Sequence, residues 1–142
     1  MLIGEYKGKL TEKNRIAIPK KFRVKLEDKI YITRGYERCL IVLDENRWNN
    51  LIKNIEIKPF LNRSVRDTKR FILGGAEEIN WDSQGRFVIP ESLTTYAEIE
   101  KEVIFVGISD WLEVWDNQKW ETKLADLTES AGEIAERLAD NN

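Results

Sequence analysis

The strongest constraint on the fold is an internal repeat, in which the second half of the chain echoes the first at an offset of about 71 to 73 residues. The best-matched segments each read as a small turn residue, Arg, three apolar residues and Pro. The aligned segments are 14–19 with 85–90, 29–33 with 102–106, and 43–48 with 115–120. One repeat is only about 45 residues long, near the size at which a single hydrophobic core rarely holds without disulfides or metal. We therefore expect the two repeats to share one core.

Each repeat is predicted to form a strand, a tight turn, a second strand, a short helix and two further strands. Asn14 and Gly85 occupy the same turn position, and Gly and Asn are the residues that adopt positive φ most readily. Pro19 and Pro90 fit the first position of the short helices. The residues predicted to face inward from these helices are Phe22, Leu26, Leu93 and Ala97.

The later strands and helix starts also recur. The strand-like runs, which are rich in apolar and β-branched residues, are 30–33, 39–43, 103–106 and 112–115. Asp44 and Asp116 then fit the N-cap position of helices that contain Trp48 and Trp120. Because these tryptophans recur at equivalent places, we expect core or interface packing rather than ligand stacking.

The repeats predict a division of the chain into four segments. These are a first repeat over residues 5–47, a helical connector over 48–75, a second repeat over 76–119 and an amphipathic C-terminal helix over 120–142. The connector reads as helices interrupted at Pro59 and ended by Gly74 and Gly75.

Composition excludes several functional classes. The 142 residues include no His and a single Cys, Cys39, which rules out Ser-His-Asp and Cys-His catalysis, histidine metal sites and an internal disulfide. Cys39 lies in an apolar run, where a thiol behaves as a small buried hydrophobe. We expect no metal, cofactor or small-molecule substrate. No apolar run approaches the roughly 18 residues of a membrane helix and no leader-like N-terminus is visible, so we expect no membrane partner and a cytoplasmic location.

The net charge of −2 conceals a gradient along the chain. Residues 1–40 hold 11 Lys or Arg against 5 Asp or Glu, residues 41–90 hold 8 against 7, and residues 91–142 hold 4 against 13. One end could therefore meet phosphate while the other repels it.

The basic end supplies candidates for contact with double-stranded DNA. Arg15 projects from the first turn beside Asn14, and a guanidinium can pair bidentately with a guanine edge. The cations expected to contact phosphate around this turn are Lys7, Lys9, Lys13, Lys20, Lys21 and Arg23. Arg86 is the equivalent arginine of the second repeat. We expect it to bind phosphate less well, because Asp82 and Glu91 are its neighbours and no lysine is nearby, and to orient its own turn through Asp82.

An ordered set of motifs resembles the MraZ family. The set comprises the paired turns at 11–19 and 82–90, Gly4-Glu5-Tyr6, Ile32-Thr33-Arg34-Gly35 with Cys39-Leu40, the stretch 70–78, Lys101-Glu102-Val103 with Val106-Gly107, and Glu113-Val114-Trp115-Asp116. The resemblance implies an α+β, mainly β, fold. Two AbrB-like swapped-hairpin repeats would form one small pseudo-twofold β-barrel with flanking helices, assembled into ring-shaped homo-oligomers. It also implies a nucleoid-associated transcriptional regulator that binds repeated promoter boxes upstream of the division and cell-wall gene cluster and usually represses its own operon.

The turn motif transfers unequally to the two repeats. Asp82, Gly85 and Arg86 match the Asp-x-x-Gly-Arg pattern of the family. In the first repeat Thr11 stands in place of Asp and Asn14 in place of Gly. Thr11 can still bond the turn backbone, although more weakly than Asp, and Asn14 tolerates the left-handed conformation.

Two other functional classes stay open. An enzyme could use carboxylates such as Glu77, Glu78, Asp82 and Glu113, but no phosphate loop, nucleophile elbow or metal-ligand spacing accompanies them. A protein-interaction or antitoxin-like module could instead use the acidic C-terminal helix to bind another protein.

Overall fold

The computed structural model describes residues 1–57 and 61–141. The strands are β1 (Leu2–Lys9), β2 (Arg15–Ala17), β3 (Lys29–Arg34), β4 (Leu40–Asp44), β5 (Glu77–Asn80), β6 (Arg86–Val88), β7 (Glu102–Ser109) and β8 (Leu112–Asp116). The α-helices are α1 (Lys20–Arg23), α2 (Glu45–Glu56), α3 (Arg63–Ile72), α4 (Glu91–Tyr96) and α5 (Asn117–Asp140), with 3-10 turns at Glu12–Asn14 and Tyr36–Arg38. The predicted interruption at Pro59 lies outside the described residues.

The strands of the two repeats are interleaved. One antiparallel sheet has the order β1-β7-β8-β4-β3-β5, and β2 pairs with β6 in a separate two-stranded ribbon. If each strand is replaced by its equivalent in the other repeat, the same order is obtained, read from the opposite edge of the sheet. The topology therefore has a local twofold symmetry. The first strand of each repeat pairs with the third strand of the other, β1 with β7 and β5 with β3. The prediction of an α+β, mainly β, chain with a shared core is confirmed.

Equivalent residues face each other where the local axis passes. Ile16 pairs with Phe87 in the ribbon, and Ile41 pairs with Glu113 at the centre of the sheet. Each member of these pairs occupies the same repeat position as its partner. The two repeats are therefore related by a local twofold axis that passes through these two pairs.

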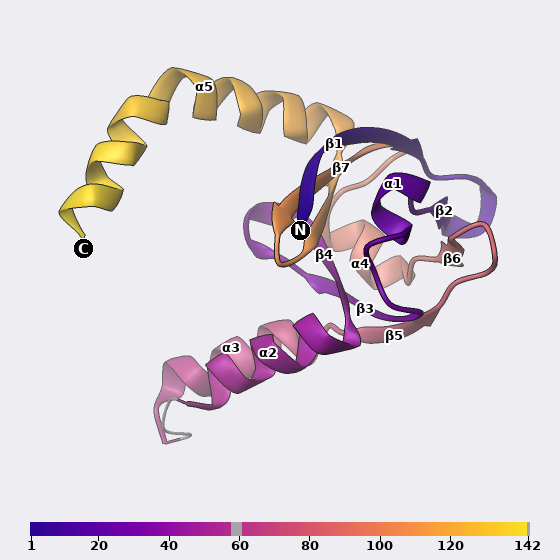
Figure 1. Cartoon of the computed structure of the whole chain (residues 1–142), viewed down its shortest axis with the longest axis horizontal. Coiled ribbons are helices and arrows are strands. Elements are labelled where there is room, and N and C mark those ends of the chain that lie inside the picture. The colour runs from indigo at the N-terminus through magenta and orange to yellow at the C-terminus, as the bar shows by residue number, and fades with distance from the viewer. Residues whose placement is uncertain (58–60, 142) are drawn as a thin grey trace.

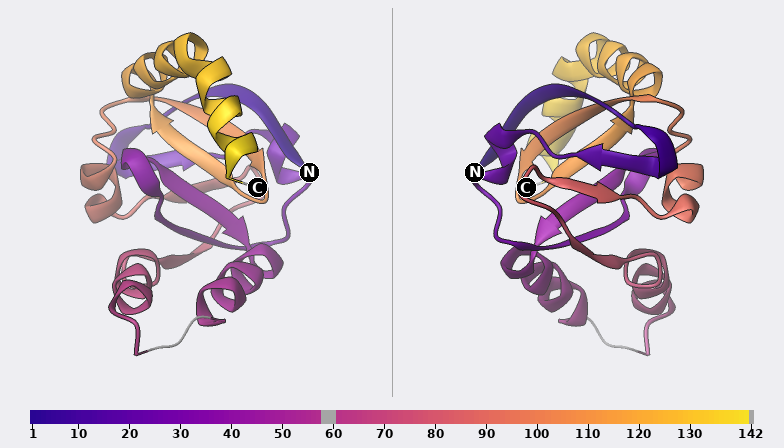
Figure 2. Two further views of the ribbon diagram at one scale, coloured as in Figure 1. Left: turned by 90° about the vertical axis from the view of Figure 1, so that its left-hand side faces the viewer. Right: turned by 90° about the vertical axis from the view of Figure 1, so that its right-hand side faces the viewer.

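The ribbon and the helical projections lie at opposite ends of the molecule. Figure 1 shows β2, β6, α1 and α4 together at one end, while α5 and the α2–α3 pair project from the opposite side in different directions. The perpendicular views agree, with the ribbon across the front in one and α5 nearer the viewer in the other (Figure 2).

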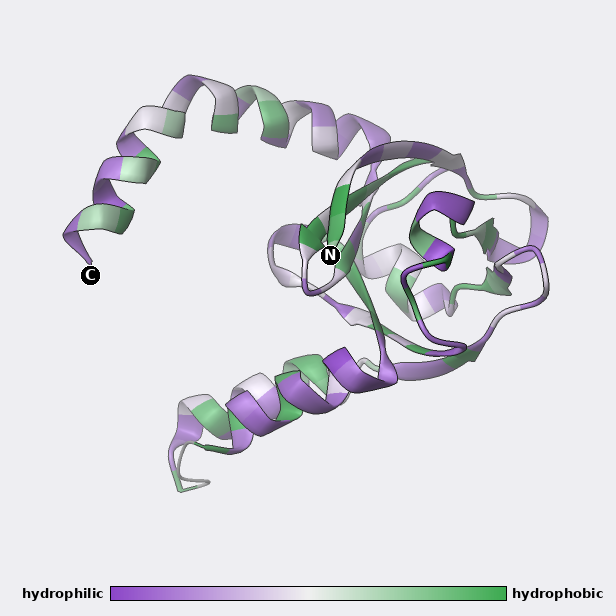
Figure 3. Ribbon diagram, in the orientation of Figure 1, coloured by the Kyte–Doolittle hydropathy of each residue, from purple (hydrophilic) through white to green (hydrophobic). Residues whose placement is uncertain are grey.

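Two apolar clusters lie on the two faces of the sheet. The larger joins the inner face to the ribbon and the short helices, and includes the fully buried Phe22, Ile32, Ile89 and Phe105. The smaller joins the outer face to α2, α3 and α5. It comprises Cys39, Ile41, Leu43, Trp48, Ile72, Ile104, Val106, Trp115 and Trp120. Hydropathy colouring shows apolar residues along the strands and a mixture of apolar and polar residues along the helices (Figure 3).

Both short helices differ by one residue from the expected start. Pro19 and Pro90 are N-cap residues with extended ψ values of 142° and 138°, not first helical residues. Each proline carbonyl accepts the first helical hydrogen bond, from Phe22 N or Leu93 N at 2.9 Å. The inward stripe is confirmed, because Phe22, Leu26, Leu93 and Ala97 are all buried.

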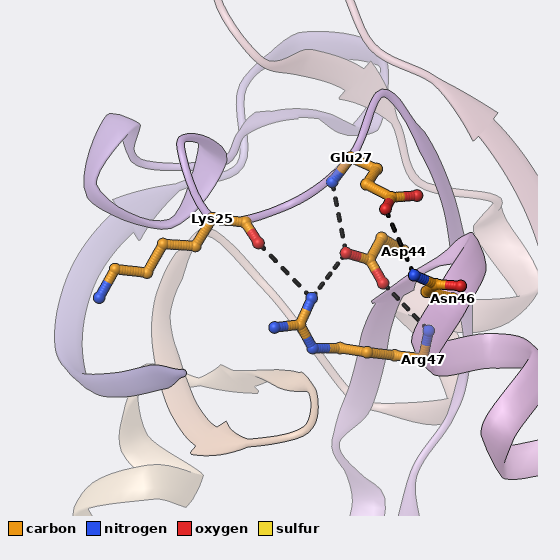
Figure 4. A network of polar contacts seen from close by, with 5 residues as sticks. All are labelled: Lys25, Glu27, Asp44, Asn46 and Arg47. Carbon is orange, nitrogen blue, oxygen red and sulfur yellow. Dashed lines mark hydrogen bonds and ion pairs between the residues drawn. The ribbon is translucent and has the colours of Figure 1, made fainter.

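The predicted aspartate caps are confirmed. Asp116 accepts from Lys119 N at 3.4 Å, and the almost fully buried Asp44 accepts from Arg47 N at 3.1 Å and from Arg47 Nη1 at 2.6 Å. Asp44 also accepts from Glu27 N, while Arg47 Nη1 reaches the Lys25 carbonyl, so one carboxylate joins α2 to the loop before β3 (Figure 4). A buried carboxylate with this many donors is fully compensated.

The recurring tryptophans pack as expected, and the indole N–H groups of Trp111, Trp115 and Trp120 donate to carboxylates. Trp48, Trp115 and Trp120 are buried. Trp120 Nε1 donates to Glu5 Oε1 at 2.8 Å, which joins the start of α5 to β1.

The buried thiol gives a direct test of the outer core. Cys39 is fully buried, and burial, with the nearby Glu113 carboxylate, raises the pKa of its thiol. We expect no reaction with a thiol-specific reagent in the native state at pH 8 and one equivalent in denaturant, because the thiolate is the reactive form. Rapid native labelling would show that the outer face opens.

Candidate nucleic-acid interface

Two turns of similar backbone geometry flank the ribbon. Thr11 N donates to Arg15 O at 2.8 Å, and Asp82 N donates to Arg86 O at 3.1 Å. Positive φ values occur at the predicted positions, 57° at Asn14 and 76° at Gly85, and also at Lys13, where φ is 62°. Lys13 was not anticipated, since lysine has no special tolerance for this conformation.

The side chains that structure the turns differ. Asp82 accepts from Gln84 N at 2.8 Å, Arg86 N at 3.0 Å and Arg86 Nε at 2.8 Å. Hydrogen bonds from the Arg86 backbone N–H and guanidinium lower the pKa of the Asp82 carboxyl to about 2. In the first turn Thr11 Oγ1 donates to Arg15 O at 3.1 Å and supplies no carboxylate.

The ribbon has one buried and one exposed face. Ile16 and Phe87 point into the core, whereas Arg15, Ala17, Arg86 and Val88 are exposed. Arg15 lies opposite Val88 and Ala17 lies opposite Arg86. The two arginines are therefore diagonal neighbours on one surface, at a backbone separation usually of about 7 to 8 Å.

The structure corrects the predicted surroundings of both arginines. Ile18 N donates to Gly85 O at 3.0 Å, and a Cβ at Gly85 would collide with the Arg23 side chain, so α1 lies beside the second turn. Ile89 N donates to Asn14 O at 2.8 Å and Asn14 Nδ2 donates to Thr94 Oγ1 at 3.4 Å, so α4 lies beside the first turn. Sequence neighbours separate because antiparallel pairing sets the end of each strand beside the start of the other.

Because α1 lies beside the second turn and α4 beside the first, the predicted phosphate contacts do not all surround Arg15. Lys20, Lys21 and Arg23 all lie on α1. The Arg23 side chain lies beside Gly85 in the turn that holds Arg86, whereas Lys21 Nζ lies beside Gly4 of β1. Glu91 shares a shallow hollow with Lys13 and Asn14 instead. No lysine was expected near Arg86, and the basic residue that lies beside its turn is an arginine, Arg23.

Lys7 and Lys9 face a different part of the molecule. They lie at alternate positions along β1 with Glu5, which contacts Trp120, so the three side chains share one face of the strand. Both line a hollow with Glu102 and Asn117 at the start of α5. The structure therefore sets these two lysines apart from the exposed face of the ribbon.

Most cations at the ribbon end are not neutralised. Within residues 1–57 and 61–141, no carboxylate forms an ion pair with Lys13, Arg15, Lys20 or Arg23. Arg86 is the exception, through its 2.8 Å pair with Asp82. Lys21 lies 5.5 Å from the centroid of the Phe22 ring.

The carboxylates considered for catalysis do not converge. Glu78 pairs with Lys29 at 3.4 Å on the edge strand β5, and Asp82 serves its own turn. Glu113 accepts from the indoles of Trp115 at 2.9 Å and Trp111 at 3.4 Å. In the described part of the chain, no group of three or more His, Cys, Asp or Glu could hold a metal ion, and no helix is long and apolar enough to cross a membrane.

These features define a tandem-repeat β protein whose two halves jointly present a basic, arginine-bearing ribbon. The family model described as "MraZ protein, putative antitoxin-like" matches residues 1–71 and again 72–142, and the chain belongs to the MraZ family. The family is one of transcriptional regulators, not enzymes.

Curated relatives agree over the full length. Proteins named transcriptional regulator MraZ are 41% identical over 98% of this chain in Acetivibrio thermocellus and 40% identical over 99% in Halothermothrix orenii, covering 97% and 98% of those proteins. The protein of that name from a Thermoanaerobacter species is 39% identical over 100% of this chain and 99% of its own.

The turn glycine offers a stability test. Gly85→Ala is expected to lower the free energy of unfolding by at least about 1 to 2 kcal/mol, because alanine resists positive φ and its Cβ would meet Arg23. Gly132→Ala is the matched control: it lies in α5 with open space around it, and should raise helix stability by up to about 1 kcal/mol. Equal effects in chemical denaturation would contradict this account of the turn.

Proposed function

We propose that the protein is a sequence-specific transcriptional regulator that binds double-stranded promoter DNA through the exposed face of the β2–β6 ribbon. The observation that carries the proposal is the placement of Arg15 and Arg86 as diagonal neighbours on one exposed surface, with unneutralised cations around it. A two-stranded β-ribbon fits the major groove of B-DNA, where arginine recognises guanine. The names of the full-length relatives support the same function.

The side chains divide into base and phosphate contacts. Arg15 and Arg86 project from the ribbon and are suited to base edges. Lys13, Asn14, Lys20, Lys21 and Arg23 would contact phosphates, which fixes register without reading sequence. Lys7 and Lys9 would at most reach DNA that bends toward β1. The acidic C-terminal helix projects from the other end, where it does not oppose the phosphates (Figure 1).

The finer architecture belongs to the same proposal. We propose that residues 5–47 and 76–119 are AbrB-like swapped-hairpin halves of one barrel, with the connector 48–75 and the helix 120–142 appended. The exchanged pairing of β1 with β7 and β5 with β3 supports this description. The proposed cellular role is cytoplasmic and nucleoid-associated. The protein would bind repeated boxes upstream of the division and cell-wall genes and repress its own operon.

We also propose that chains assemble head to tail into rings. The distal part of α5 is exposed and carries Leu124, Ile134 and Leu138 beside five acidic residues and one Arg between 124 and 140. An apolar hollow of about 260 Å³, lined by residues that include Leu51, Ile55 and Trp111, lies beside α3, which has four basic residues and one Asp. The basic α3 and the acidic distal part of α5 are complementary in charge, and pairing unlike surfaces can close a ring. Neighbouring ribbons could then engage adjacent boxes, with the avidity gain of linked sites.

Arg15→Ala tests the ribbon. We expect affinity for the promoter upstream of its own gene to fall about 5- to 150-fold relative to unrelated duplex, since one bidentate contact contributes about 1 to 3 kcal/mol of discrimination. The melting temperature should stay nearly unchanged because Arg15 is exposed. Electrophoretic mobility shift and calorimetry check both. A large loss of melting temperature would show that Arg15 is structural.

The matched control is Lys20→Ala with Lys21→Ala. This variant should weaken every duplex alike and reduce the salt slope by about one unit per lost phosphate contact. A wild-type chain that leaves the promoter unshifted at low salt would instead favour a protein-interaction or antitoxin-like module.

Ile134→Asp with Leu138→Asp tests assembly. We expect sedimentation to shift from an oligomer to a monomer, because charge would enter the apolar stripe of α5. Val24→Asp is the control: Val24 is 70% exposed on the ribbon side of the molecule and should leave the oligomer intact. A monomeric wild-type chain at micromolar concentration would refute assembly.

A further inference from the structure

The Asp82–Arg86 pair is anchored in a way that leaves part of the guanidinium available. One Asp82 oxygen, Oδ1, accepts the backbone N–H groups of Gln84 and Arg86 at 2.8 and 3.0 Å. The other oxygen, Oδ2, accepts from Arg86 Nε at 2.8 Å. The turn therefore fixes the carboxylate, and the carboxylate fixes the inner edge of the guanidinium.

The outer edge of Arg86 is open. Among the described residues, neither Nη1 nor Nη2 has a hydrogen-bond acceptor, and the side chain is 48% exposed. Arginine presents donors along two useful edges, one through Nε and one through the paired Nη groups. Because Nε is occupied, only the end-on Nη1–Nη2 pair can meet a ligand.

A pair of parallel donors held at fixed spacing is complementary to two neighbouring acceptors. In the major groove, guanine presents O6 and N7 in that arrangement, and no other base offers two adjacent acceptors there. Ala17 lies directly opposite Arg86 and is also exposed, so the cross-strand position beside Arg86 carries only a methyl group. A guanidinium that is already oriented loses less conformational freedom on binding.

We infer that Arg86 reads a guanine end-on through Nη1 and Nη2, and that Asp82 is the positioning residue that sets its orientation. The inference rests on the proposed DNA-binding function and adds to it a division of labour between the repeats. Arg15, which has Thr11 where Arg86 has Asp82, projects without a carboxylate to hold it and adapts to its contact. Asp82 was expected to weaken the binding of Arg86 to phosphate. We infer instead that it orients Arg86 to recognise a base.

The decisive variant is Asp82→Asn, which is nearly isosteric. The asparagine oxygen can still accept the backbone N–H groups of the turn, but its amide group donates and cannot accept from Arg86 Nε. Arg86→Lys is the second variant, because it keeps the charge and removes the fork. The probes are duplexes selected by the wild-type chain from a randomised pool, together with all single base-pair substitutions of them.

Fluorescence anisotropy of these duplexes should show one guanine position that depends on Arg86. We expect Arg86→Lys to reduce discrimination at that position about 5- to 150-fold and to leave the other positions and the salt slope unchanged. Asp82→Asn should reduce it at the same position with little change in melting temperature. In the Arg86→Lys background Asp82→Asn should have no further effect, since the two residues act through one contact.

Three outcomes would overturn the inference. If both variants discriminate between bases as well as the wild-type chain does at every position, the Asp82–Arg86 pair only stabilises its turn and does not contact a base. Uniform weakening of all duplexes would make Arg86 a phosphate contact. A wild-type chain that selects no sequence would refute the proposed function itself, which separates that failure from the first two.

Discussion

The contact between Ile16 and Phe87 is the one on which the arrangement of this molecule depends. These equivalent residues pair across the ribbon and are both buried, so the local axis passes between them. Antiparallel pairing at this point sets the turn of each repeat against the helix of the other. Each half also contributes an edge strand to the sheet of its partner. Neither repeat could therefore form the exposed face of the ribbon by itself, because each repeat supplies only one of the two strands.

The symmetry of the backbone is not matched by the side chains. The α1 positions Lys20 and Lys21 correspond to Glu91 and Ser92 on α4, so only one end of the ribbon is strongly basic. The turn residues differ in the same sense, since Asp82 orients an arginine and Thr11 does not. A pseudo-symmetric scaffold with unlike ends would contact a duplex in one preferred direction.

Features governed by nearest neighbours were predictable. The positive φ at Asn14 and Gly85, the aspartate caps and the four later strands follow from local sterics and hydrogen bonding, so their residue types identify them. The prolines lie at the N-cap, one residue before the predicted first helical position. Both positions accept a residue without a backbone N–H, so the residue type alone does not distinguish them. Arg34, which donates to the Phe71 carbonyl at 3.0 Å and caps α3, gave no sequence signal, since the two residues are 37 positions apart.

The sequence by itself determined that the chain is a duplicated, mainly β unit with one arginine in each of two tight turns, because repetition, turn chemistry and burial patterns are written in consecutive residues. Only the tertiary structure decided that Arg23 lies beside the turn of Arg86 and that Glu91 lies beside the turn of Arg15, although chain order suggests the opposite assignment. The physical reason is strand exchange. Residues that are close along the chain are carried to opposite ends of an antiparallel ribbon, whereas residues about 70 positions apart become neighbours.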